Sequence, residues 1–594
     1  MTTLLLRRAP LVAALLLGLA ATSAQAGQTC DVSFSTTSGG ATATGEEAFA
    51  CGPNARAAGR RATAIGTRAS ASEEDTVAVG QDSIASGFHS AAIGGQAVSS
   101  GRGATAVGWQ ARATGEFSTA TGNTALASGA NSTANGRASQ ATGDNSTAVG
   151  QDAQATGLNS TAVGQASRAT GEDATAIGQA ANASGFHSSA LGAQATASGR
   201  GATATGWQAR ATGDLSTATG NTAVASGANS TATGRAATAS GANSSATGQG
   251  SVANNVNTTA TGQGSVASGE DATATGQGAQ AAGFHATATG ALANASGRGA
   301  TATGWQAAAT GELSTATGNS AVASGANSTA NGRAAAASGA NSTASGQGAV
   351  ASSVNTTATG QGAVASDEDA LANGQGAQAT GFHSSAIGTQ ATASGRGATA
   401  TGWQAQATGA LSTSTGNSAV ASGENSTANG RAATASGANS VAIGASSNAS
   451  ASNSVSLGNG STNTRANTVS VGSAGSERQI INVANGTSRS DAVNFGQITD
   501  GLAELRGYAD GRFHAQDERI DKIGAMGSAM STMLASASGI NQDNRIAAGV
   551  GFAGSESALA VGYQRRINDR ATFTLGGSFT NDESTAGLGF GYGW

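Results

Sequence analysis

The chain has 594 residues and a formal net charge of −5, and glycine alone supplies 91 of its residues. Aromatic residues make up 4% and charged residues 10% of the chain, which excludes a thick globular core and a basic surface for nucleic acid. A flexible Gly/Ser linker is also excluded, because the glycines keep the strict period described below and linkers have no reason to hold one.

The N-terminal segment 1–26 is typical of a secretory signal peptide. Arg7 and Arg8 precede an apolar run, and residues 24–26 (AQA) form a small-x-small cleavage site. We therefore expect an exported protein whose mature chain begins near Gly27. No later stretch has the ~20 apolar residues of a transmembrane helix, so a membrane anchor would be a β-barrel or a partner.

The mature chain contains two cysteines, Cys30 and Cys51. In an oxidising compartment we expect them to pair and close a small N-terminal loop. Two free thiols are the alternative, which exposed secreted chains usually avoid. Nothing beside them suggests metal ligands.

A glycine period organises most of the chain. Stepping by seven from Gly45 to Gly472 gives 62 positions, and 56 of them are glycine. The other six are Glu73, Asn255, Ser353, Asp367, Ala451 and Arg465. Asn and Asp adopt positive φ angles more readily than other side chains, so we expect Asn255 and Asp367 to be tolerated.

Two kinds of heptad alternate, as in residues 145–150 (NSTAVG) and 151–157 (QDAQATG), so the true unit is a pair of heptads. Within each half the side chains alternate with period two, which predicts a strand of about five to six residues ended by a glycine turn. Coils of two strands and two turns can stack, with backbone hydrogen bonds along the axis. We expect about 30 coils and a rod on the order of 150 Å. A coiled coil is excluded here, because its repeated residue would have to be Leu or Ile.

Seven coils together form a longer repeat, which we call a block and number from the N-terminus. Each marker residue returns to the same side of the rod every ~34 Å. The markers are Phe-His pairs, tryptophans, arginines and acid pairs. They are Phe88-His89, Phe186-His187, Phe284-His285 and Phe382-His383; Trp109, Trp207, Trp305 and Trp403; Arg102, Arg200, Arg298 and Arg396; and Glu74-Asp75, Glu172-Asp173, Glu270-Asp271 and Glu368-Asp369.

The tryptophans and arginines are the best candidates for ligand contact, because large exposed aromatics in a chain so poor in them invite a partner. Duplication without a binding role remains an equal alternative. The acid pairs could hold a cation, but a solvated turn is favoured. The histidines are too far apart to share a metal within one chain, although three chains could bring copies together at an axis. The NST motif at 131–133 is a weak glycosylation signal in a repeat that already favours Asn at turns.

The segment after the last heptad, residues 470–498 (SVGSAGSERQIINVANGTSRSDAVNFGQI), closely resembles the neck of YadA-like trimeric autotransporter adhesins. The heptads resemble the head repeats of that family, as at residues 439–444 (NSVAIG). The resemblance implies a left-handed parallel β-roll head, three intertwined chains and transport of the head through the protein's own barrel. Longer stalks are missing here, and the cysteine pair is atypical.

Apolar residues return with helical spacing after the neck and predict a trimeric coiled-coil stalk. They fall at steps of three and four from Ile498 to Leu534, with a stutter at Leu505-Ala509-Phe513. About 38 residues of helix would span roughly 57 Å. Such an apolar stripe needs a partner, since a lone helix would expose it to water.

The C-terminal segment predicts four membrane-spanning strands, at 544–553, 558–567, 571–580 and 585–594. One face of each is apolar, and the other carries glycines, among them Gly549, Gly551, Gly562 and Gly576, which we place in a barrel lumen. Four strands cannot close a barrel, and eight would leave a lumen filled by side chains. Twelve strands from three chains leave space for three helices, which predicts a homotrimer.

The sequence thus predicts a signal peptide (1–26), head (27–472), neck (473–496), stalk and pore helix (497–540) and membrane anchor (541–594). We expect a surface adhesin with multivalent binding to host, matrix or cell-surface ligands, anchored in outer-membrane lipid with the help of the barrel-assembly machinery. The alternative is a structural or ice-binding solenoid, because rows of Thr in TATG turns form a flat, regular face. We expect no enzymatic activity, no metal, no cofactor and no nucleic-acid partner.

Overall fold

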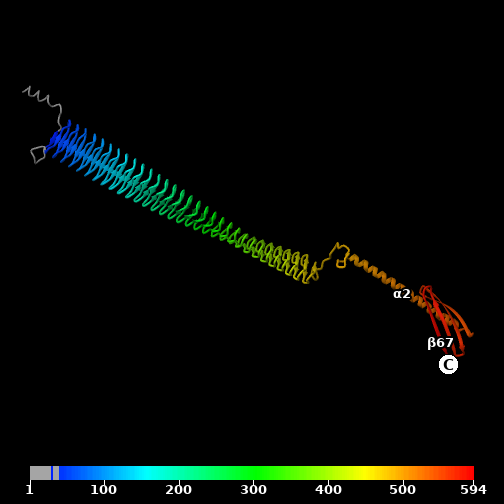
Figure 1. Cartoon of the computed structure of the whole chain (residues 1–594). Helices are drawn as coiled ribbons and strands as arrows, with labels where there is room; N and C mark the ends of the chain where they lie inside the picture. The colour runs from blue at the N-terminus through cyan, green and yellow to red at the C-terminus, as the bar shows by residue number, and fades with distance from the viewer. Residues whose placement is uncertain (1–27, 31–38) are drawn as a thin grey trace, which may run out of the picture. The chain divides into compact units, whose positions relative to one another are not determined.

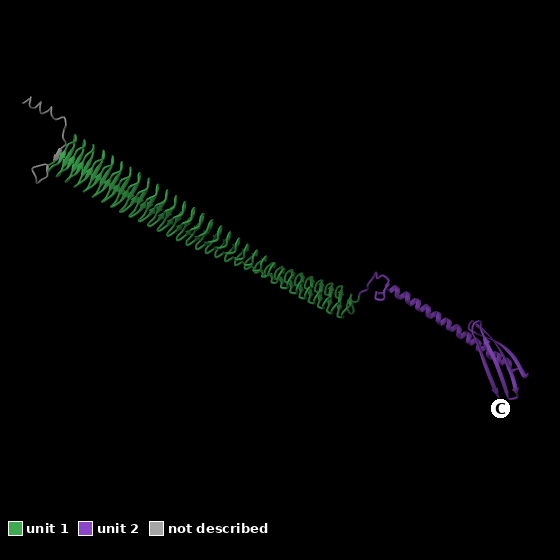
Figure 2. Cartoon of the chain, viewed as in Figure 1, with its two compact units in different colours: residues 1–477 green, residues 478–594 purple. Residues whose placement is uncertain are grey.

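The computed structural model describes residues 28–30 and 39–594, so the predicted signal peptide lies outside the described residues. The chain, drawn in Figure 1, divides into two compact units, residues 1–477 and 478–594, which Figure 2 colours green and purple. Each unit is described by itself below. Within the described residues, no helix is both long and apolar enough to cross a membrane.

Unit 1 is a parallel β-solenoid in which each coil spans two heptads (Figure 1). Three-residue strands recur once per coil from β3 (Phe49–Cys51) to β61 (Val455–Leu457), and two-residue strands recur from β2 (Thr42–Ala43) to β62 (Thr462–Asn463). Strands β1 (Gln28–Cys30) and β63 (Val469–Ser470) lie at the two ends. The odd-numbered strands form one parallel sheet of 32 strands, and the even-numbered strands form a second sheet.

Each coil pairs in register with the next coil along the chain. Thr147 of β17 (Thr147–Val149) is paired with Thr161, and its amide N–H donates to the carbonyl of Ser160 at 2.8 Å. The expected strands of five to six residues are wrong in length. Two three-residue turns and the residues that join them to the strands occupy much of each coil, which leaves one strand of three residues and one of two.

The core of the solenoid consists almost entirely of alanine and serine. In β17, Ala148 is fully buried while Thr147 and Val149 are partly exposed, and the pattern repeats in the other odd-numbered strands. Small side chains suffice because the two sheets close over a thin interior, and the stability comes from backbone pairing between adjacent coils. The predicted alternation with period two is therefore confirmed.

The periodic glycines fall into two classes. Those that follow three-residue strands, such as Gly150, are all glycine, and from Gly52 to Gly458 their φ angles lie between 110° and 141°. L side chains rarely adopt such angles. Those that follow two-residue strands, such as Gly143, have no such φ, but a Cβ there would collide with the carbonyl of the matching residue in the next coil.

All six exceptions to the glycine period belong to the second class. The prediction that Asn255 and Asp367 are tolerated because Asn and Asp adopt positive φ angles is wrong, since neither residue has a positive φ. Positive φ falls two positions later, at the second turn residue, as in Asn257 (55°) and Asp369 (56°). The preference of Asn and Asp for this conformation therefore shapes the turn but does not explain the exceptions.

Unit 2 contains one helix and one antiparallel sheet. Helix α2 (Phe495–Ser538) has 44 residues, which corresponds to a length of roughly 66 Å. The sheet has the order β64-β65-β66-β67, with β64 (Asn544–Ala553), β65 (Glu556–Asn568), β66 (Ala571–Phe579) and β67 (Ser584–Tyr592). These bounds agree closely with those of the four predicted strands.

The neck sequence folds back on the start of α2 through side-chain hydrogen bonds. The side-chain oxygen of Asn494 accepts from the Gln497 amide at 2.8 Å and forms a capping box with that residue. Gln497 also bridges to Gly486, accepting at 2.8 Å and donating at 3.0 Å. The Asp491 carboxylate accepts from the amides of Thr487 and Ser488, and these bonds lower the pKa of Asp491.

Candidate functional site

The four tryptophans lie in turns of the head and are about half exposed. Trp305 follows β39 (Thr301–Thr303) and Gly304, whose φ of 128° bends the chain away from the sheet. The exposed fractions are 52%, 47%, 48% and 48% for Trp109, Trp207, Trp305 and Trp403. We call the turns after the three-residue strands, such as residues 304–306, the Trp edge.

The predicted arginines do not share that edge. Arg298 lies in the turn between β38 (Asn294–Ala295) and β39, on the opposite edge of the same coil. We call the turns after the two-residue strands, such as residues 297–299, the acidic edge. The structure therefore separates the two sets of candidate contact residues, Trp109, Trp207, Trp305 and Trp403 from Arg102, Arg200, Arg298 and Arg396.

On the acidic edge each arginine is held by its own neighbours. The guanidinium of Arg298 lies 5.8 Å from the Phe284 ring centre, and its Nη1 is 3.2 Å from Oε1 of Glu312. Phe284 stacks on His285 with ring centres 3.9 Å apart. The imidazole Nε2 of His285 lies 2.8 Å from the carboxylate of Asp271. The markers of this edge thus contact one another.

A ladder of asparagines extends this cluster along the acidic edge. Asn229 donates to Asn243 at 3.1 Å, Asn243 to Asn257 at 3.0 Å, and Asn257 to the carboxylate of Asp271 at 2.7 Å. All four residues have φ near 55°, a conformation that Asn and Asp adopt at low cost. The Asn side chains of the NST motifs on this edge therefore act as rungs of a coil-to-coil ladder.

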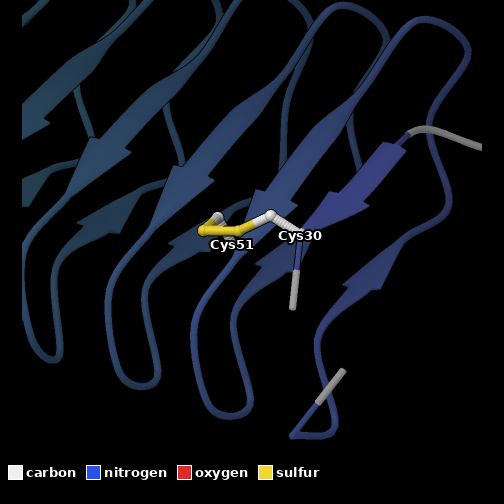
Figure 3. The surroundings of a disulfide bond; sticks show 2 residues. All are labelled: Cys30 and Cys51. Atoms are coloured by element: carbon white, nitrogen blue, oxygen red, sulfur yellow. A yellow bond between two sulfur atoms is a disulfide. The ribbon is translucent and has the colours of Figure 1, made fainter. Parts of the chain in front are cut away.

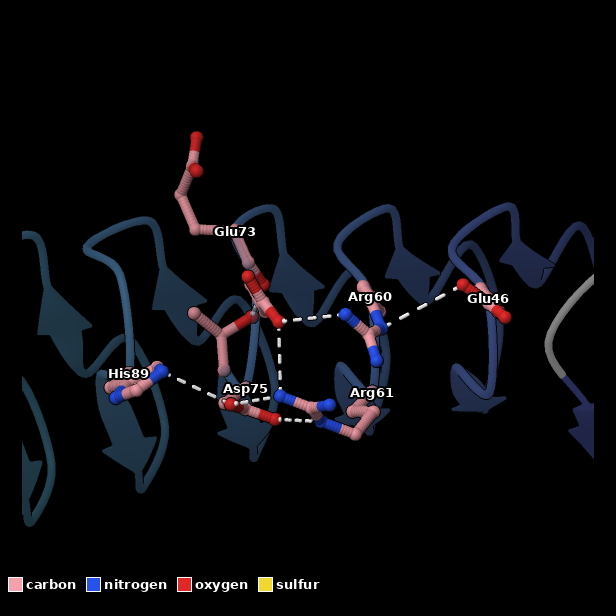
Figure 4. Close-up of polar contacts among 8 residues, drawn as sticks. Glu46, Arg60, Arg61, Glu73, Asp75 and His89 are labelled. Carbon is pink, nitrogen blue, oxygen red and sulfur yellow. Dashed lines mark hydrogen bonds and ion pairs between the residues drawn. The ribbon is translucent and has the colours of Figure 1, made fainter.

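The first block carries an ion-pair ladder in place of the asparagines, as Figure 4 shows. Arg61 donates to Asp75, and this bond lowers the pKa of the Asp75 carboxyl. In the second block the positions of Arg60 and Arg61 hold Leu158 and Asn159. The other ion pairs of the ladder in the first block are Arg60–Glu46 at 3.7 Å, Arg60–Glu74 at 3.5 Å, Arg61–Glu74 at 2.9 Å and Asp75–His89 at 3.0 Å.

The aspartate of each acid pair contacts a histidine. Asp75, Asp173, Asp271 and Asp369 each face the histidine of the next coil, at 2.7 to 3.0 Å. Among residues 28–30 and 39–594, no three His, Cys, Asp or Glu side chains lie close enough together to hold a metal ion.

Cys30 and Cys51 form a disulfide at the N-terminal end of the solenoid (Figure 3). They are register partners in the adjacent parallel strands β1 and β3, with Cα atoms 4.7 Å apart. The disulfide links β1, the end strand of the sheet, to its neighbour β3, at a position where the sheet has a neighbouring strand on one side only.

The glycine face of the anchor sheet lies against α2. A Cβ on Gly551 or Gly549 would collide with the helix backbone, and one on Gly562 or Gly576 would collide with the Met533 side chain. The other face is exposed, as at Val550 (55%). The helix contacts the sheet through Ala525, Met526, Ala529, Met533 and Ala537.

Sequence reasoning missed that helix stripe, because it consists mainly of alanines beside the stronger Ile/Leu signal. Most of the predicted apolar seam lies elsewhere on α2, and only its C-terminal end, at Met530, packs beside this stripe. Leu502, Leu505, Phe513 and Ile520 on this seam are 58–66% exposed in the single chain. These large side chains, spaced as in a coiled coil, leave a face of α2 without a partner within unit 2.

Sequence reasoning also missed the polar neighbours of the tryptophans. On the Trp edge, the residues one and two coils after Trp305 are Asn319 and Arg333, and both are exposed. The same order holds in all four blocks. Aligning the sequence of each coil under that of the coil before it would have found this row, whereas pairing markers by nearness in sequence did not.

Comparison with known families gives two matches. Residues 537–594 match the YadA-like membrane anchor domain, and repeated matches to the YadA head domain repeat run between residues 43 and 461. Together they cover more than half of the chain.

One solved structure that matches is the collagen-binding domain of the Yersinia adhesin YadA. It is 25% identical to the matched part, which covers 35% of this chain and 84% of that one, with a TM-score of 0.16. A comparison with curated proteins returned no match.

Proposed function

The chain belongs to the YadA-like family of trimeric autotransporter adhesins, and we propose that its head attaches the cell to other surfaces by binding a ligand at many equivalent positions. The family places the C-terminal domain in the outer membrane and the head on the cell surface. The multivalent binding of a ligand and the contact residues that bind it are proposed here.

One observation supports multivalent ligand binding by the head: an exposed Trp residue recurs in the same turn of every seventh coil, four times in each chain. Successive copies are ~34 Å apart along the axis. Three chains would offer up to twelve copies of the same contact. Weak single contacts then give strong attachment, because each bound copy raises the effective concentration of the next.

The test compares two sets of four substitutions in the full-length protein displayed on cells. The first set is Trp109→Ala, Trp207→Ala, Trp305→Ala and Trp403→Ala. The second, a matched control, removes four exposed apolar residues of the acidic edge, Phe117→Ala, Leu215→Ala, Leu313→Ala and Leu411→Ala.

Attachment is measured on collagen, other matrix proteins, glycans and cell surfaces at equal surface amounts of protein. We expect the Trp set to lose attachment and the control set to keep it. Unchanged attachment by the Trp set would remove the Trp row from the proposal. If deletion of the whole head left attachment unchanged, the adhesive role itself would be refuted.

We propose in addition that the anchor is the pore through which the head leaves the cell. The glycine face gives space for helices, and a groove of about 410 Å³ beside α2 is lined by Met530, Leu534, Thr574 and Gly589. Twelve strands from three chains would close a barrel around three helices. Bulky residues at Gly549 and Gly551 should block export, so that surface labelling of the head falls while the protein stays in the cell.

A second candidate, an ice-binding face, is favoured by one observation. From β25 (Thr203–Thr205) to β41 (Thr315–Thr317), nine successive strands of the first sheet place Thr at both outward positions, with Ser245 as the single exception. The row ends at Leu191 and Asn331. The purified protein should then inhibit ice recrystallisation and Thr261→Tyr should reduce the effect; no inhibition by the unaltered protein would exclude this function.

A further inference from the structure

The Trp edge of the head carries a row of hydrogen-bond donors that have no partners in the structure. In the third block these are the Trp305 indole N–H, the Asn319 side-chain amide and the Arg333 guanidinium, each one coil after the last. Within the described residues, none of the three groups donates a hydrogen bond or forms an ion pair. The same three residue types recur in the other blocks as Trp109, Asn123 and Arg137; Trp207, Asn221 and Arg235; and Trp403, Asn417 and Arg431.

The acidic edge shows that free donors are not a general property of these turns. There the amide of Asn229 donates to Asn243, and Arg298 pairs with Glu312. On the Trp edge the glutamines beside the tryptophans are satisfied in the same way, since Gln110 donates to Gln96, Gln208 to Gln194 and Gln404 to Gln390. The Trp, Asn and Arg side chains of the row differ from these glutamines, because they donate no such bond. Within the row, Asn319 accepts a hydrogen bond from Ser320 at 3.0 Å, but its side-chain N–H groups stay free. Exposed donors that make no internal hydrogen bond contribute little to the stability of the solenoid, so their repetition suits a ligand.

Charge is also divided between the edges. Between residues 95 and 460, the turns of the Trp edge contain four arginines and one acidic residue, Asp152. The facing turns of the acidic edge contain twelve Asp and Glu residues against four arginines. The Trp edge is therefore a locally positive strip on a chain whose net charge is −5. A strip of this kind attracts anions and repels basic partners.

We propose that the Trp edge binds an extended anionic polysaccharide that lies along the axis of the head. The Trp ring offers a flat apolar surface for one face of a sugar ring. The Asn amide one coil on donates to hydroxyl groups, and the guanidinium two coils on, about 10 Å away, takes a carboxylate or sulfate. The rise of one coil is comparable to one sugar residue of an extended chain, so successive residues of the ligand meet successive side chains.

This inference rests on the proposed adhesive function and names its ligand class. The Trp edge stays outside the trimer contact for a physical reason: three chains meeting along it would bring like-charged arginines together at an axis. The first sheet offers an outward face of Thr, Val and Ile without such charges, as at Val149 and Ile177. The row therefore faces solvent on each of the three chains.

The test uses the full-length protein displayed on cells and fluorescent polysaccharides as probes. Chondroitin sulfate carries sulfates and carboxylates, hyaluronan and polygalacturonate carry carboxylates alone, and dextran is neutral. The variant combines Arg137→Gln, Arg235→Gln, Arg333→Gln and Arg431→Gln, which keeps an N–H donor on each side chain but removes the charge. The matched control combines Arg102→Gln, Arg200→Gln, Arg298→Gln and Arg396→Gln on the acidic edge.

We expect the displayed protein to bind at least one anionic probe and not dextran. The Trp-edge variant should bind about tenfold or more weakly, because each site loses a charge-assisted contact, while the control should bind within about twofold of the unaltered protein. Lysines at the same four positions should recover part of the binding. Added salt should weaken binding by the unaltered protein and have less effect on the variant.

Three results would overturn the inference: equal losses in both variants, binding of dextran as strong as that of the charged probes, or no polysaccharide binding at all. If no polysaccharide bound but attachment still depended on the four tryptophans, the ligand class would be rejected and the adhesive function would stand. Trimer content on gels shows that each variant has folded. If the Gln variant lost its trimer, the variant with lysines at the same four positions would replace it, because lysine keeps the charge and the donors. Loss of all binding by a trimeric Lys variant would then overturn the inference.

Discussion

The two glycine classes make a prediction that separates backbone conformation from crowding. Gly220 belongs to the first class, with φ of 131°, and a Cβ there would lie 2.6 Å from the carbonyl oxygen of Gly234. Gly227 belongs to the second class, in which the chain itself places Asn255 two coils further on. We therefore compare Gly220→Ala with the control Gly227→Asn.

The expected cost of Gly220→Ala follows from two contributions. Holding a side chain in this backbone region costs about 1–3 kcal/mol. Moving the neighbouring carbonyl away from the new Cβ weakens coil-to-coil hydrogen bonds, such as that from Gly234 N–H to the Thr219 carbonyl at 2.7 Å, by about 1–3 kcal/mol. The sum is about 2–6 kcal/mol. For Gly227→Asn only the second contribution applies: the new Cβ would lie 1.9 Å from the carbonyl oxygen of Gly241, but the backbone needs no forbidden φ. We therefore expect about 1–3 kcal/mol for this variant.

The assay is amide hydrogen exchange by mass spectrometry on the full-length trimer. Each coil contacts mainly its neighbours, so the loss of protection should be confined to peptides around the substitution. A cost of about 2 kcal/mol corresponds to about 30-fold faster local exchange, and Gly220→Ala should reach or exceed this. Equal exchange in the two variants, or faster exchange in Gly227→Asn, would refute the division into classes.

Three further predictions concern the ends of the chain. Cys51→Ser should loosen the first strands, with a loop-entropy loss of about 3 kcal/mol seen as faster exchange in the first coils only. Because Arg61 lowers the pKa of Asp75, their contact stabilises the first coils at pH values above the ordinary carboxyl pKa of about 3.9, and this contribution is lost as pH falls through the lowered value. Amide exchange of the first coils should therefore become faster in acid, and Arg61→Gln should remove this acid dependence. Gly562→Ala should destabilise the anchor by about 1–3 kcal/mol, because its methyl group meets Met533. Heating before electrophoresis should dissociate that trimer at a lower temperature, and adding Met533→Ala should reverse the effect.

Much of the fold could be predicted because its signals are local and repeated. The alternation around Ala148 predicts a strand, and glycine at every seventh position predicts turns, so a coil of two heptads follows from sequence alone. The anchor strands are likewise visible, since Val550 and Phe552 alternate with glycines. The exact strand lengths were not predictable, because the number of residues in each turn depends on how adjacent coils pair.

The candidate site could be predicted only in part, because each edge of the head consists of residues that are one full coil apart in the sequence. The sequence by itself determined that the Trp305 position returns in every seventh coil and lies in a turn. Only the tertiary structure decided that Arg298 faces the other edge and that Asn319 and Arg333 follow Trp305 on its own edge. The same holds for Met533 against Gly562, since the contact depends on how a helix packs on a sheet. Periodicity along the chain specifies which residues form strands and turns, whereas register between coils decides which side chains meet.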